Sequence, residues 1–139
     1  MKKLLLLLIF AIGFQAFSQQ KQAKIEFKQQ EIDYGQIDKN SDGTKTFEFT
    51  NTGDAPLIIN RVKSSCGCTV PSKPTQPIMP GKSDKIVVKY NTHRVGPFRK
   101  TITVYSNAKE NVVILKIKGK VVDPEAVNLK RKVASPVLK

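Results

Sequence analysis

The sequence predicts an all-β fold in a single domain that follows an N-terminal export signal. Short runs of alternating apolar and polar residues fill the chain from Lys24 onward, and turn-forming residues separate these runs. No stretch has the periodicity of an amphipathic helix. Alternation of this kind places one face of each strand against a core and leaves the other in water, which is typical of a β-sandwich or barrel.

The first eighteen residues have the composition of a signal peptide. A basic start at Lys2 and Lys3 precedes an apolar run over 4–14, and the small residues Ala16 and Ser18 fit a peptidase site. We expect cleavage after Ser18, because the apolar run is shorter than the roughly 20 residues of a membrane span. The mature chain would be periplasmic or extracellular, would keep 121 of the 139 residues, and would have no membrane span.

The alternation predicts about seven strands in a domain that covers residues 24–122. Four prolines between 71 and 80 exclude a central strand there, because proline cannot donate to the ladder. Beyond Asp123 the alternation stops and few large apolar residues follow, so we expect residues 123–139 to form a basic, loosely ordered tail. The expected strands are 24–28, 31–37, 44–51, 57–64, 84–91, 98–106 and 112–122, with a short additional candidate near 68–71.

Five motifs in order carry a resemblance to one bacterial family. They are Ile32-Asp33-Tyr34-Gly35-Gln36-Ile37, the run from Phe47 to Ile59 with its Asn51-Thr52-Gly53 turn, Ser64-Ser65-Cys66-Gly67-Cys68-Thr69, Pro80-Gly81, and Arg94-Val95-Gly96-Pro97-Phe98. Together they resemble the secreted domain of unknown function numbered 1573, over roughly residues 24–122. The resemblance implies an immunoglobulin-like sandwich similar to ASH and major-sperm-protein domains, and it implies no activity.

The two cysteines, Cys66 and Cys68, allow three interpretations. On an extended strand their side chains share one side, with Cα atoms roughly 6.6 Å apart, and Gly67 lets the backbone tighten toward disulfide geometry. Export favours a local structural disulfide, although so small a loop would add little stability. The alternatives are a copper or zinc site, since thiolates suit these ions, and a redox pair activated by the nearby Arg61 and Lys63.

A third metal ligand is available in His93, the only histidine. If the runs from 44 to 91 alternate in direction, the end of the 57–64 strand and the 91–97 loop lie at the same end of the sandwich. Cys66, Cys68 and His93 could then meet around one metal ion. The simpler interpretation is a solvated loop histidine.

The net charge and the lack of catalytic motifs limit the classes of function that the sequence can support. Loss of Lys2 and Lys3 with the signal reduces the net charge from +13 to +11, which favours an anionic partner. No motif places a nucleophile beside His93, the acids are scattered, and no nucleic-acid module is present. We therefore expect no enzyme and no nucleic-acid partner. The function expected is an exported binding or structural module for an envelope protein or polymer. Alternatives are metal or redox chemistry at the cysteine pair, and capture of a strand at a sheet edge.

Overall fold

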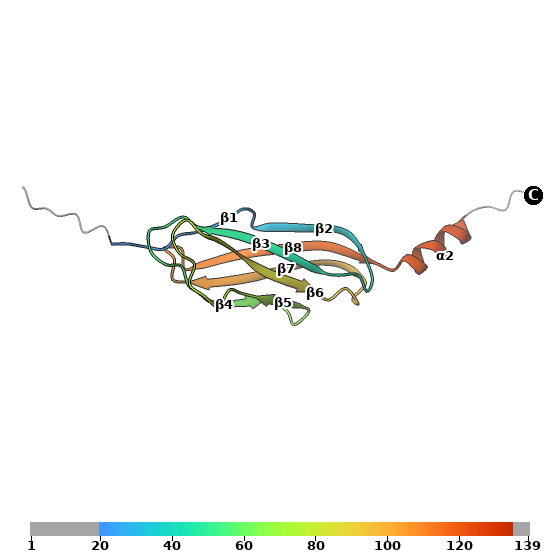
Figure 1. Ribbon diagram of the computed structural model, residues 1–139. Coiled ribbons are helices and arrows are strands. Elements are labelled where there is room, and N and C mark those ends of the chain that lie inside the picture. Colours follow the sequence, from blue (N-terminus) through green and yellow to red (C-terminus); the bar gives the residue numbers. More distant parts are fainter. Residues whose placement is uncertain (1–19, 135–139) are drawn as a thin grey trace, which may run out of the picture.

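The computed structural model describes residues 20–134, whose strands form two sheets packed face to face (Figure 1). The first sheet has the order β1-β3-β6-β5, from β1 (Ile25–Phe27), β3 (Thr44–Asn51), β6 (Ser83–Tyr90) and β5 (Thr69–Ser72). The second sheet has the order β2-β8-β7-β4, from β2 (Glu31–Asp38), β8 (Val112–Val122), β7 (Gly96–Ser106) and β4 (Ile59–Ser64). The predicted signal peptide, residues 1–18, lies outside the described residues.

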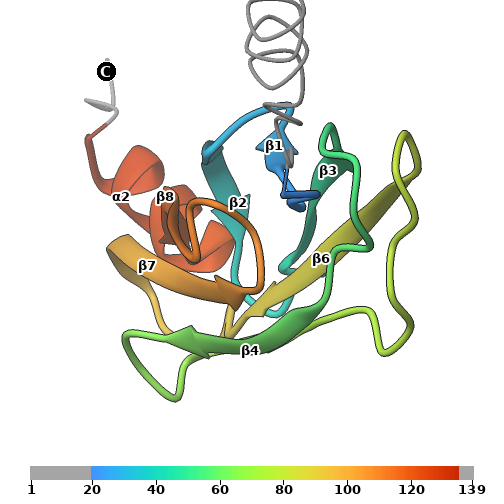
Figure 2. The ribbon, with the colours of Figure 1, turned by 90° about the vertical axis from the view of Figure 1, so that its left-hand side faces the viewer.

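The consecutive strands β1 and β2 belong to different sheets. β1 pairs antiparallel with β3, whereas β2 pairs parallel with β8. All other pairings are antiparallel. Figure 2 shows the result, with β7 and β8 on one side of the sandwich and β3 and β6 on the other. The N-terminal strands therefore join the two layers along one side.

The core lies between the sheets and follows from the alternation along each strand. Phe47 and Phe49 of β3 are fully buried, and so are Leu115 and Ile117 of β8. Their neighbours along each strand face outward, because successive side chains of a strand point to opposite faces. The predicted all-β sandwich is confirmed, and the strand near 68–71 exists as β5. Pro71 is tolerated there because β5 is an edge strand.

The helix α2 (Pro124–Ala134) lies in the segment 123–139, for which we expected a loosely ordered basic tail and no helix. The Asp123 carboxylate accepts a hydrogen bond from the Glu125 N–H at 3.2 Å, as a helix N-cap does. Pro124 suits the first helical turn, and basic residues in the last turn complement the helix dipole. Figure 1 shows α2 extending from one end of the sandwich. Across residues 20–134, no helix is long and apolar enough to cross a bilayer.

Candidate functional site

The Cys66-Gly67-Cys68 turn carries the chain from β4 in the second sheet to β5 in the first. The two sulfur atoms are bonded to each other, and the Cα atoms are 5.3 Å apart. This is shorter than the separation expected for an extended Cys-Gly-Cys segment, because residues 65–68 bend into a turn instead of continuing β4. The turn thus bridges the two sheets at one end of the sandwich.

Hydrogen bonds on both sides hold this turn in place. On the second sheet, the Ser65 N–H donates to the Thr101 carbonyl of β7 at 2.9 Å. Toward the first sheet, the Asn91 N–H donates to the Cys68 carbonyl at 2.8 Å. The Ser64 hydroxyl lies 2.7 Å from the carbonyl oxygens of both Cys66 and Thr69. The backbone is therefore anchored independently of the disulfide.

The two cysteines differ in exposure. Cys68 is buried with 6% of its surface exposed, whereas Cys66 is only partly buried against the core. The Cys66 sulfur lies 3.8 Å from the Thr69 hydroxyl oxygen. Gly67 is exposed, and a Cβ atom added to it would meet nothing within 4 Å. Cys66 is therefore the more solvent-exposed residue of the pair.

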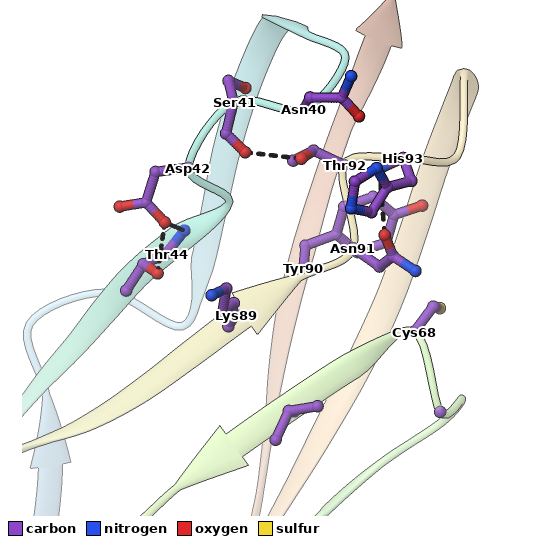
Figure 3. Close-up of a pocket in the computed structure, with 12 residues that line it drawn as sticks. Asn40, Ser41, Asp42, Thr44, Cys68, Lys89, Tyr90, Asn91, Thr92 and His93 are labelled. Carbon is purple, nitrogen blue, oxygen red and sulfur yellow. Dashed lines mark hydrogen bonds between the residues drawn. The ribbon is translucent and has the colours of Figure 1, made fainter.

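A pocket of about 850 Å³ lies beside the turn (Figure 3). Its walls come from the β2–β3 loop, the Gly67–Val70 segment and the loop that follows β6. The Thr92 hydroxyl donates to the Ser41 carbonyl at 2.6 Å and so fixes two of these walls to each other. The lining residues are Asn40, Ser41, Asp42, Thr44, Gly67, Cys68, Val70, Lys89, Tyr90, Asn91, Thr92 and His93.

Two titratable groups of the pocket have shifted pKa values. Hydrogen bonds from the Thr44 hydroxyl and N–H hold the pKa of Asp42 below its usual range, so its carboxylate stays charged. Burial raises the pKa of Tyr90, whose ring stacks on Phe98 with centroids 3.8 Å apart. The pocket thus has a fixed negative charge on one wall and a neutral phenol in its floor.

The structure brings part of the predicted metal set together. Cys68 and His93 line the same pocket, as the alternation of strands implied, whereas Cys66 does not line it. Both cysteine sulfurs are engaged in the disulfide, so neither offers a thiolate. Among residues 20–134, no group of three metal-binding side chains could hold an ion. Metal binding stays a prediction that would first require the disulfide to be reduced.

A second candidate site is the outward side of the sheet β2-β8-β7-β4, which we call the basic face. Strand register brings residues from three strands together: Arg99 lies opposite Lys118, and Arg61 lies opposite Tyr105. Val112 and Ile114, which are 45% and 52% exposed, continue the same side of β8. The cations of the basic face are Arg61, Lys63, Arg99, Lys116, Lys118 and Lys120.

Within the described part of the chain, Lys118 is the one cation of the basic face that forms an ion pair. Lys118 forms ion pairs with Glu31 and, at 3.8 Å, with Asp33. These contacts lower the pKa of Glu31 and raise the pKa of Lys118, so both groups stay charged over a wide pH range. Arg99 and Lys116 lie close enough to lower the pKa of Glu31 further, but among residues 20–134 they form no ion pair with a carboxylate. Arg61 stacks over the Tyr105 ring at 4.7 Å.

The opposite outward face is electrically mixed. Glu48 of β3 pairs with Lys28 and lies opposite Lys85 of β6. The lysine row of β8, which is Lys116, Lys118 and Lys120, follows from the local alternation of the sequence. The sequence could not show that Arg61, Lys63 and Arg99 join this row, because strand register is set by long-range pairing.

Comparisons with known proteins agree with this fold. Residues 25–121 match the model of a family described as "Protein of unknown function (DUF1573)", which confirms the resemblance expected from the motifs. A solved Porphyromonas gingivalis W83 protein of unknown function is similar, with 18% identity and a TM-score of 0.65 over 78% of this chain. This chain spans about half of that protein, 51% of its length. No curated protein matches the chain.

Two further structures place the fold among immunoglobulin-like domains. An ASH/PapD-like domain of human CEP192 has a TM-score of 0.62 at 9% identity, over 78% of this chain and 92% of that domain. The other is from Acinetobacter baumannii, a pre-assembly complex of the chaperone CsuC with the tip adhesion subunit CsuE of Csu pili. Its matching chain has a TM-score of 0.53 at 14% identity, over 84% of this chain and 71% of its own. At these identities the likeness shows the fold alone.

Proposed function

The chain belongs to the DUF1573 family, and we propose that it is an exported, non-enzymatic binding module of the cell envelope. The observation that carries this proposal is the basic face. Six cations gather on one side of one sheet, only Lys118 among them forms an ion pair in the described residues, and the opposite side is mixed. Such a separation of charge steers and orients an anionic partner.

The groups between these cations favour a protein partner. Tyr105, Val112 and Ile114 offer aromatic and aliphatic contact beside the charges. Aromatic and aliphatic groups within a charged rim are typical of protein interfaces. Glu31 and Asp33 border the same face and would repel a wide anionic bilayer laid across it. We therefore propose an acidic segment of another envelope protein as the partner.

The edge strands β4 and β5, one from each sheet, support recognition by the basic face instead of strand capture. β5 contains Pro71, which cannot donate to an added strand. The Lys73 ammonium donates to the Ile59 carbonyl of β4 at 2.8 Å. Charged side chains and prolines at an edge discourage pairing with another strand. A chain of the CsuC–CsuE chaperone–adhesion subunit pre-assembly complex has a similar fold, and for the present chain we propose that the partner contacts the basic face.

Charge reversal on the basic face should weaken binding to an acidic peptide. We expect Arg99→Glu with Lys120→Glu to weaken binding to a poly-glutamate peptide by about tenfold or more, with a smaller salt dependence. The matched control is Lys82→Glu with Lys109→Glu, which changes the net charge equally but lies outside the face. Titration by fluorescence anisotropy at two salt concentrations measures the effect.

Equal weakening in both double variants would show that only the net charge matters, and would contradict a defined face. Stronger retention on vesicles of anionic phospholipid than on the peptide, lost only in the basic-face variant, would move the proposal from a protein partner to a membrane surface.

Export is tested by the intact mass of the protein recovered from a bacterial periplasmic fraction. We expect a mass that lacks residues 1–18, because Ala16 and Ser18 fit the recognition positions of a signal peptidase. A variant with Ala16→Gln should accumulate with the signal attached. Full-length protein in the cytoplasm for both forms would contradict export.

A further inference from the structure

We propose that the Cys66–Cys68 disulfide exchanges with a protein dithiol, with Cys66 as the sulfur that the incoming thiolate attacks. This activity goes beyond the proposed binding role and rests on different residues. The basic face needs no sulfur chemistry, whereas the Cys-Gly-Cys turn contributes nothing to that face.

The first support is that the disulfide is not needed to hold the fold. It closes a loop of only three residues, and the stabilisation that a crosslink gives falls as the loop shortens. The turn is anchored by the hydrogen bonds of Ser65 to Thr101 and of Asn91 to Cys68. Oxidised and reduced chains can therefore share one structure, as a reversible exchange requires.

The second support is the difference in access to the two sulfurs. Attack on a disulfide needs an approach in line with the bond, so the exposed sulfur receives the nucleophile and the buried sulfur leaves. Cys66 is the more exposed residue, and the open space over Gly67 leaves room for an approaching chain. Cys68, at 6% exposure, is the leaving group on the pocket side.

The third support is the polar surroundings of both sulfurs. The Thr69 hydroxyl, 3.8 Å from the Cys66 sulfur, can donate to a Cys66 thiolate in the reduced state. On the other side, Asn91, Thr92 and His93 line the pocket that Cys68 also lines, so polar groups border the space beside the Cys68 residue (Figure 3). Hydrogen bonds and nearby cations are what lower the pKa of reactive cysteines in general.

The exchange proceeds in two balanced steps. A partner thiolate attacks the Cys66 sulfur, a new disulfide forms between the partner and Cys66, and Cys68 leaves as a thiolate that takes up a proton. The partner's second thiolate then attacks the partner's first sulfur, which is bonded to Cys66 in this mixed disulfide. A disulfide forms within the partner, and Cys66 is released as a thiolate. Two electrons pass from the partner dithiol to the cysteine pair, and the partner leaves as a disulfide.

Two single-cysteine variants test the assigned roles. Cys68→Ser leaves only the accessible Cys66 thiol, and Cys66→Ser leaves only the buried Cys68 thiol. We expect the Cys68→Ser protein to react with the aromatic disulfide DTNB about tenfold faster or more. Circular dichroism shows whether each variant is folded. Adding Thr69→Val to Cys68→Ser should shift the pH profile of the reaction upward, which a structural role of Thr69 would not do.

The activity itself is tested on the oxidised wild-type protein with a synthetic peptide that contains two reduced thiols. We expect one peptide disulfide per protein, and mass mapping of acid-quenched intermediates should locate the peptide on Cys66. No transfer until the protein is denatured would overturn the proposal and leave a structural disulfide. Equal DTNB rates in the two single-cysteine variants would overturn the assignment of Cys66.

Repeating the transfer with Arg99→Glu and Lys120→Glu separates this activity from binding at the basic face, because the exchange should persist in that variant.

Discussion

Asn51→Asp is expected to lower the free energy of unfolding by about 4 kcal/mol, because it places a carboxylate in a fully buried hydrogen-bond network. The Asn51 side chain is 0% exposed. Its amide nitrogen donates to the carbonyl oxygens of Ala55 at 2.8 Å and Ile78 at 2.9 Å. Its amide oxygen accepts from the N–H groups of Gly53 at 3.0 Å and Lys24 at 3.3 Å.

A carboxylate can replace the oxygen of this amide but not its nitrogen. In the aspartate variant, one carboxylate oxygen would face the Ala55 and Ile78 carbonyls and repel both. These contacts tie the β3–β4 turn to the start of β1 and to the segment around Ile78, so the damage spans three parts of the chain. The loss should shrink in acid, where a protonated carboxyl can donate to one carbonyl.

Urea unfolding followed by circular dichroism measures this effect, with the slope of the transition compared between variants. Asn111→Asp is the matched control, because Asn111 is exposed and its side chain makes no hydrogen bond in the described structure. Similar midpoints for the two variants would show that the Asn51 network does not hold the turn.

Gly43→Ala is expected to lower the free energy of unfolding by about 3 kcal/mol, because the backbone leaves no room for a side chain. A Cβ atom on Gly43 would lie 2.2 Å from the Tyr90 carbonyl oxygen and 2.9 Å from a methyl carbon of Thr92. The Gly43 carbonyl also accepts hydrogen bonds from the Tyr90 N–H and the Tyr34 hydroxyl, both at 2.9 Å. Relief of the clash would disturb both bonds.

The Tyr34 hydroxyl is a dependable donor at this position. Burial, with a smaller effect of the Asp42 carboxylate, raises the pKa of Tyr34 to about 12, so the phenol stays protonated at any physiological pH.

Gly67→Ala is the control for Gly43→Ala. Its added Cβ atom meets nothing within 4 Å, and we expect its unfolding midpoint to stay close to that of the wild type. An equally small effect at Gly43 would contradict the close approach of β3 and β6.

The strands were predictable because their burial depends on alternation, which is local. Ile86 and Val88 are buried between exposed or half-buried neighbours, as their spacing indicates. The role of Asn51 was not predictable in the same way. Its sequence context indicates a turn, but its amide reaches Ile78, 27 residues further along. Helix α2 was missed although its start signals around Asp123 are present and Ala126, Leu129 and Val133 have helical spacing. The helix is short, and its large apolar residues stay exposed instead of forming a buried face.

In the candidate sites, too, the features that depend on local sequence were predictable and those that depend on long-range packing were not. The meeting of Cys68 and His93 followed from strand direction, which the number of alternating runs predicts. The difference in exposure between Cys66 and Cys68 did not, because it depends on how the turn sits between two sheets. The basic face likewise needed the register of β4 and β7, which no single stretch of the sequence contains.

The position of β8 has a consequence for the order in which the protein can fold. β8 lies inside the second sheet, between β2 and β7, although it is the last strand in the sequence. β2 therefore has no partner in that sheet until the chain has been made through Val122, and such long-range pairings form slowly. A chain threaded across a membrane must stay unfolded during transit. If the protein is exported as we propose, an N-terminal strand whose partner comes last would delay completion of the sandwich until nearly all of residues 20–122 have crossed.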